Sequence, residues 1–158
     1  FGVRAACVGR LGARGGGRLV PLLLRREGRQ AAESGHAQTQ RVFSSATYLM
    51  DHLHEVPVHL IPCIQGRPKG PVPAAALSGL FGSIYPAIWS FQLAARSRGL
   101  GSALTTLHLA CEQEAQDILG IPEDIQQVAL LPVAHTIGTD FKQAARDPVA
   151  EITHWSQW

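Results

Sequence analysis

Two groups of residues in this chain could together hold a flat ligand that carries a phosphate. Lys142 and Arg146 are basic, and such side chains bind phosphate well, arginine in a bidentate manner and lysine as a point charge. Residues 105–107 follow a tight turn at residues 99–101, where glycine lets a backbone approach a ligand closely. This segment could therefore form a wall beside the ligand. A surface loop with solvated basic side chains explains the same composition, and composition alone favours it.

Histidines also gather in one stretch, DHLHEVPVHLIPC, at residues 51–63. His52 and His54 form an H-x-H pair, which can bind a metal ion when both side chains share one strand face. His59 alternates with apolar neighbours that we expect to face the core. Because the remaining metal ligands are missing, we interpret these residues as partly exposed or hydrogen-bonded histidines and predict no metal site.

Other catalytic patterns are weaker. Ser83 lacks the Gly-x-Ser-x-Gly pattern of a nucleophile elbow, and we expect it to begin a helix instead. Three carboxylates occupy the polar side of a short predicted helix and are expected to be solvated: Glu112, Glu114 and Asp117. The glycine run at residues 15–17 lacks the Lys-Ser/Thr pair of a phosphate loop. The sequence therefore predicts no catalytic acid or base.

The elements that must position these residues begin, in our interpretation, near Val42. Apolar residues at helical spacing predict a helix over residues 42–55. The mostly apolar stretch at 56–64 is typical of a central strand buried on both faces. Glycine and proline at residues 66–73 predict a surface loop.

A second helix is predicted over residues 83–98, and it is apolar on nearly every face, as core and interface helices are. Pro86 fits its first turn, and Gly99 should end it in the left-handed conformation.

Three more elements follow this helix. We predict a strand at 103–109, a short amphipathic helix at 111–121, and a second buried strand at 125–137. The short helix should turn its apolar residues inward: Ala115, Ile118 and Leu119.

The first part of the chain has a different composition. Residues 1–41 hold eight arginines against Glu27 and Glu33, and they show no clear periodicity. We expect a disordered Arg/Gly-rich segment over 1–41, followed by one domain over 42–158. A basic arm could bind nucleic acid, but its arginines are not interleaved with aromatic residues that would stack on bases. We therefore expect no nucleic-acid partner.

The remaining composition fits a soluble protein with one core. The chain has 158 residues, of which 46% are hydrophobic. The apolar run at 19–24 is too short to cross a bilayer, and we expect no other stretch to be long enough, so we expect no membrane partner. Three widely spaced cysteines without a CxxC motif indicate reduced thiols and a cytoplasmic location.

Two longer stretches resemble a known family. GSIYPAIWSFQLAARSRGLGSALTTLHL at 82–109 and LLPVAHTIGTDFKQAAR at 130–146 are similar to the C-terminal half of flavin-dependent nitroreductases. The first looks like the family's central interface helix, and the second like its terminal strand, loop and basic tail. The resemblance covers residues 42–158. It implies an α+β fold with a mixed, mainly antiparallel sheet flanked by helices, N-terminally incomplete because the family's Arg-x-Ser-x-Arg motif is absent.

That resemblance implies an FMN-dependent oxidoreductase that passes hydride from NAD(P)H through the flavin to a nitroaromatic or quinone-like acceptor. It also implies a homodimer formed by the 83–98 helix and the C-terminal tail. The cofactor would be bound by one residue at the start of the helix, three beside the flavin ring and two at the phosphate: Ser83, Thr105, Thr106, Leu107, Lys142 and Arg146. The alternative is a truncated, non-catalytic dimerising remnant without flavin.

Overall fold

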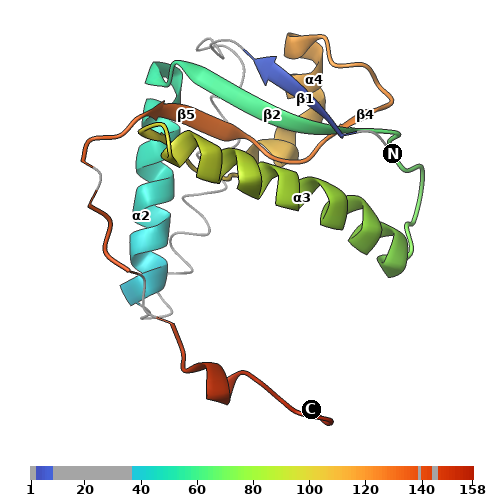
Figure 1. Ribbon diagram of the computed structural model, residues 1–158. Helices are drawn as coiled ribbons and strands as arrows, with labels where there is room; N and C mark the ends of the chain where they lie inside the picture. The colour runs from blue at the N-terminus through green and yellow to red at the C-terminus, as the bar shows by residue number, and fades with distance from the viewer. Residues whose placement is uncertain (1–2, 9–36, 139, 144–145) are drawn as a thin grey trace.

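The computed structural model of the chain describes residues 3–8, 37–138, 140–143 and 146–158 (Figure 1). The glycine run at 15–17 and most of the basic segment lie outside the described residues. All six candidate cofactor-binding residues lie within them.

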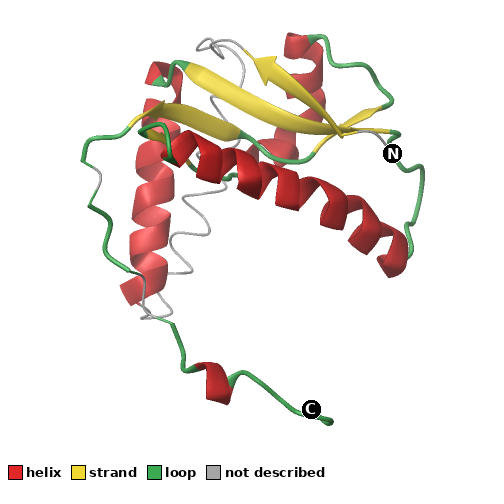
Figure 2. Cartoon of the chain, in the orientation of Figure 1, coloured by secondary structure: helices red, strands yellow, loops and turns green. Residues whose placement is uncertain are grey.

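A single antiparallel sheet organises the described part of the chain (Figure 2). Its strand order is β1-β2-β5-β3, and β4 pairs with the remaining length of β2. The strands are β1 (Val3–Val8), β2 (Val58–Gln65), β3 (Leu100–Ser102), β4 (Ile125–Gln127) and β5 (Leu131–His135). Each pairing is antiparallel, with Leu60 opposite Leu131 at the centre of the sheet. Together with the helices, this is the expected α+β architecture.

Strand β1 differs from the expectation of disorder at residues 3–8, whereas residues 9–36 of that segment lie outside the described residues. Its six residues pair with β2 along almost the whole length of that strand. Helix α2 (Ala37–His52) also begins before Val42. The backbone hydrogen bonds that β2 offers along its free edge explain why a segment without clear alternation is ordered. The division of the chain at residues 41 and 42 otherwise stays a prediction.

The long helix α3 (Ala74–Arg96) crosses one face of the sheet (Figure 1). It starts directly after Pro73, so Pro86 lies inside the helix and Ser83 lies near its middle. The prediction of a helix start at Ser83 was therefore wrong. Alanines are strong helix formers, and the three alanines that follow Pro73 extend the helix toward the N-terminus. Gly99 follows the helix at a φ of 75°, which confirms its predicted left-handed conformation.

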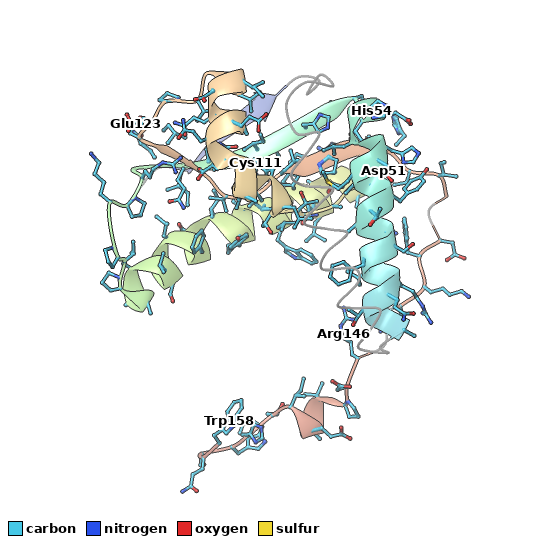
Figure 3. The ribbon with its side chains drawn as sticks, turned by 180° about the vertical axis from the view of Figure 1, so that it is seen from behind. Asp51, His54, Cys111, Glu123, Arg146 and Trp158 are labelled. Atoms are coloured by element: carbon cyan, nitrogen blue, oxygen red, sulfur yellow. The ribbon has the colours of Figure 1, made fainter. Side chains whose placement is uncertain are left out.

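The core has one cluster on each face of the sheet. Between α3 and the sheet lie fully buried side chains such as Ile84, Ile88 and Leu131. On the other face, Ile61 and Leu130 pack near helix α4 (Glu112–Leu119). Figure 3, seen from behind, shows α4 on the face opposite α3. Burial on both faces confirms the prediction of a central buried strand for β2.

Several shorter elements differ from the predictions. The predicted strand at 103–109 is wrong, because β3 ends at Ser102 and residues 107–111 form the 3-10 helix η2 (Leu107–Cys111). Only Thr105 bridges to the sheet, at Leu130. The predicted strand at 125–137 is divided into β4 and β5. Helix α4 and its stop at Gly120 are confirmed, but Ile118 is 50% exposed while Gln116 is buried.

Helix α3 also corrects the expectation that no stretch could span a bilayer. Within the described residues, α3 is the one helix whose length and composition would allow it to cross a bilayer, with a mean hydropathy of 1.2. Only 17% of the most apolar 18 residues of α3 are buried inside this chain. A helix that covers an interface between protein chains meets the same two criteria.

Candidate functional site

The segment that was expected to line a cofactor is a turn beside strand β5. Thr105 exchanges two backbone hydrogen bonds with Leu130, with N···O distances of 3.0 and 2.8 Å. Thr106 precedes η2, and its carbonyl accepts a hydrogen bond from the Leu109 N–H at 3.0 Å. The first N–H groups of such a helix have no partner within it. The turn can therefore offer backbone donors to a ligand.

Ser83 lies on the exposed side of α3, and its hydroxyl donates to the Leu80 carbonyl at 2.8 Å. Hydrogen bonds from a serine to a preceding carbonyl are common inside helices. The hydroxyl oxygen keeps its ability to accept a hydrogen bond from a ligand.

Lys142 and Arg146 are exposed on the segment that follows β5. Figure 3 places Arg146 beside the end of α2 that lies farthest from the sheet. Within one copy of the chain, the six candidate residues therefore come from three separate regions: the middle of α3, the turn before η2, and the C-terminal segment.

A groove of about 500 Å³ lies elsewhere, between α2, the C-terminal half of α3, β3 and β5. None of the six candidate residues lines it. Trp89, Phe141 and Arg96 do, and the Arg96 guanidinium lies 4.6 Å from the centre of the Phe141 ring. Gly101 lies at its floor, where an added Cβ would collide with the Thr136 side chain.

An ion pair that the sequence analysis missed lies on the α4 side of the sheet. The Arg67 guanidinium donates to both carboxylate oxygens of Glu112, at 2.9 and 2.7 Å. It also donates to the carbonyls of Glu123 and Ile125, at 3.1 and 2.9 Å. Glu112 in turn accepts the Gln127 N–H at 3.1 Å. The prediction of Glu112 as part of a solvated face was wrong.

The charges of this pair are mutually stabilised. Burial alone would raise the pKa of Glu112, but the hydrogen bonds from Arg67 and Gln127 outweigh it and lower that pKa below its ordinary value. The hydrogen bond to Glu112 raises the pKa of Arg67. Both side chains are therefore charged at neutral pH.

His108, next to this pair, has both ring nitrogens buried with no hydrogen-bond partner among the described residues. Burial lowers its pKa to about 4, and the nearby Glu112 carboxylate only partly opposes this shift. The folded protein therefore holds His108 as a neutral imidazole at neutral pH.

The histidines at 52–59 differ from expectation in one respect. His59 is fully buried and shares a hydrogen bond of 3.1 Å with the Leu53 carbonyl, while its neighbour Val58 is 41% exposed. Exposure in β2 is confined to its two ends, so Val58 differs from the expectation, while Leu60 on the same face packs against the core. Among the described residues, no cluster of three His, Cys, Asp or Glu side chains could hold a metal ion.

Comparison with known proteins gives one family. A sequence model described as the Nitroreductase family matches residues 21–135. No curated protein sequence matches the chain.

Solved structures show the same fold at low identity. A nitroreductase-like family protein from Bacillus cereus is 16% identical, with a TM-score of 0.57 over 96% of this chain and 72% of that one. A mutant of an FMN- and NADPH-dependent nitroreductase from sphigopyxis sp. strain HMH is 16% identical, with a TM-score of 0.55 over 99% and 79%. Oxidized iodotyrosine deiodinase bound to FMN and 3-iodo-L-tyrosine is 16% identical, with a TM-score of 0.54 over 92% and 73%.

Proposed function

Because this chain belongs to the nitroreductase family, we propose that it is an FMN-dependent oxidoreductase that uses NAD(P)H to reduce a small nitroaromatic or quinone-like acceptor. The family and its solved relatives are of the flavin oxidoreductase kind. The identity of the cofactor, the donor and the acceptor is our proposal for this chain.

The observation that carries the proposal is the turn at Thr106 and Leu107. It is held by the Thr105 bridge to the sheet, and it begins a helical turn whose first N–H groups have no partner within that helix. The edge of a flavin ring accepts hydrogen bonds, so these donors fit it. Lys142 and Arg146 are exposed cations that suit a phosphate dianion.

Each residue then has a binding role. Thr105, Thr106 and Leu107 form the wall beside the ring, and the Ser83 hydroxyl oxygen can accept a hydrogen bond from it. Lys142 and Arg146 neutralise the phosphate. When bound, FMN supplies the redox chemistry by accepting hydride from NAD(P)H and passing electrons to the acceptor. The protein contributes orientation and charge, and we assign no catalytic acid or base.

We further propose that the chain functions as a homodimer. Helix α3 is 23 residues long, yet it buries only Leu80, Ile84, Ile88 and Ala95 within this chain. Small residues on its exposed side, including Gly79 and Gly82, would let a second helix approach closely. The C-terminal segment extends away from the body and exposes Trp155 and Trp158 (Figure 1). An apolar surface of this extent marks an interaction site, and a second copy fits it.

The homodimer also accounts for the scattered candidate residues. If α3 of one copy packs against α3 of its partner, Ser83 of one copy and the 105–107 turn of the other can face the same ligand. Incomplete sites in single copies are common where a cofactor binds between subunits.

Reconstitution with FMN tests the proposed cofactor. We expect the purified full chain to retain FMN through desalting, with visible flavin bands, and to oxidise NADH or NADPH when a nitroaromatic is supplied. Replacing Arg146 by alanine should weaken FMN binding about tenfold, because a charged hydrogen-bond donor to phosphate is lost. Arg98→Ala is the control, since exposed Arg98, just after α3, donates to the Ala94 carbonyl in the last turn of that helix.

A colourless dimer that cannot be reconstituted would instead support the alternative, a dimerising remnant without flavin. Unchanged FMN affinity in the Arg146→Ala variant would remove Arg146 from the site.

The location of the protein is also proposed. We place it in the cytoplasm, with the apolar side of α3 covered by the second copy rather than by lipid, and without a nucleic-acid partner. Purified dimer should therefore neither float with lipid vesicles nor retard nucleic acid in a gel.

A further inference from the structure

The segment that carries the proposed cofactor wall is fastened at two ends. At one end, Thr105 is bonded to Leu130 of the sheet. At the other end, Glu112 is held by Arg67 and by the Gln127 N–H. Helix η2 lies between these ends, and its residues are half-buried or exposed, although the ring nitrogens of His108 are buried. The position of η2 therefore depends on the two attachments as well as on packing.

Arg67 is the centre of the second attachment. Its guanidinium bridges three parts of the chain: the loop after β2, the first turn of α4, and the backbone at the start of β4, at Glu123 and Ile125. The N–H groups of Gly66 and Arg67 both donate to the Asp124 carbonyl at 2.9 Å, which fixes the base of the loop. A planar guanidinium can satisfy this many acceptors at once, whereas an ammonium group cannot.

Glu112 transmits the position of Arg67 to η2. It is the first residue of α4 and directly follows η2, so its carboxylate also benefits from the helix dipole. Its backbone carbonyl accepts a hydrogen bond of 3.1 Å from the Gln127 side chain. With both its side chain and its backbone bonded, Glu112 gives η2 a fixed end.

We propose that Arg67 is a positioning residue for cofactor binding: through Glu112 it fixes η2, and thereby the ring-edge contacts of Thr106 and Leu107. The role is indirect, because Arg67 contacts α4 and β4 rather than the ligand. This inference rests on the proposed function.

Hydrogen exchange on the full chain tests the attachment itself. In Arg67→Met, which keeps the aliphatic stem, backbone amides of residues 106–111 should exchange about tenfold faster, while those of β2 and β5 stay protected. Arg67→Lys should give a smaller increase and serves if the methionine variant folds poorly. Arg98→Met is the matched control and should leave these amides unchanged, because in the described contacts the Arg98 guanidinium donates to the last turn of α3, at Ala94.

Flavin binding tests the positioning role. Arg67→Met should weaken FMN binding about tenfold, equivalent to about 1.4 kcal/mol, and shift the visible bands of the FMN that still binds. A purely structural role would not move those bands. Combining Arg67→Met with Glu112→Gln should weaken binding no further than either change alone, because the two residues act as one unit.

The possible failures are distinguishable. Unchanged exchange at 106–111 in a folded Arg67→Met protein would overturn the attachment. Faster exchange with unchanged FMN affinity and spectrum would overturn the positioning role. A wild-type chain that binds no FMN would overturn the proposed function, and hydrogen exchange would still decide whether Arg67 holds η2.

Discussion

At the scale of single residues, the structure places charged and polar groups where sequence spacing gave no indication of them. Arg67 and Glu112 are 45 positions apart and meet only because the loop after β2 turns toward α4. His108 is buried with its ring nitrogens unpaired among the described residues, at a position that the sequence analysis placed in a strand. Such a group makes the folded state less stable in acid, because its protonation would place a charge in a buried position.

The buried imidazole of His108 should make the protein less stable in mild acid. Its pKa falls from 6.5 to about 4 on folding, so the unfolded chain binds the extra proton first. Above pH 6.5, His108 leaves the free energy of unfolding unchanged. As the pH falls from 6.5 toward 4, the free energy of unfolding should decrease by up to about 3 kcal/mol. His108→Phe should therefore flatten the fall in unfolding free energy over this range, measured by urea denaturation at several pH values.

Exposed Ile118 supplies a control that does not titrate, and Ile118→Ala should leave the pH dependence as in the wild type. Buried His59, whose pKa is also lowered by burial, should account for a slope that remains in His108→Phe. An unchanged slope in His108→Phe would contradict the prediction.

At the scale of elements, isoleucine has different roles on helices α3 and α4. Ile84 of α3 is fully buried against the sheet, whereas Ile118 of α4 is 50% exposed. The sequence pattern predicted both helices, and Leu119 of α4 packs against the core as expected, but the prediction of Ile118 as an inward residue was wrong. Its Gln116 is buried instead, close enough to Arg67 for a contact of 3.4 Å, because the polar network of Arg67 and Glu112 occupies that face.

Alanine substitutions of these two isoleucines should differ in their effect on the free energy of unfolding, because one side chain is in the core and the other is on the surface. Ile84→Ala should lower the free energy of unfolding by about 2–5 kcal/mol, since it removes buried methyl groups and leaves a cavity. Ile118→Ala should cost less than about 1 kcal/mol. Urea denaturation measures both values, and equal costs would mean that α3 does not depend on this packing.

At the scale of the whole molecule, one copy leaves much apolar surface unpaired. The exposed side of α3 and the projecting C-terminal segment are the two largest contributors in the described part of the chain. Both are explained if two copies pack together, and both are difficult to explain for a stable monomer.

Gly82→Arg tests the dimer without disturbing the fold of one copy. A Cβ at Gly82 would meet no atom within 4 Å, so the arginine has room within the chain. In the proposed interface it would place an unpaired charge between two helices, and sedimentation should show a monomer. Exposed Glu114 of α4 offers the control, and Glu114→Arg should stay dimeric. A dimeric Gly82→Arg protein would place the interface elsewhere.

The sequence by itself determined the elements whose signals lie in neighbouring residues. The apolar stretch of β2, the loop at 66–73, the stop of α4 at Gly120 and the left-handed turn at Gly99 were all predicted, as was the family. These features depend on local backbone preferences and on the order of apolar residues, which a linear chain displays directly.

Only the tertiary structure decided which of these residues are partners. It extended α3 past Ser83, turned His59 into the core, and joined Arg67 to Glu112. Within one chain, it placed the 105–107 turn beside Leu130 and Arg146 near the far end of α2. The reason is that burial and pairing arise where distant segments meet, and their energies depend on neighbours that the local sequence does not contain.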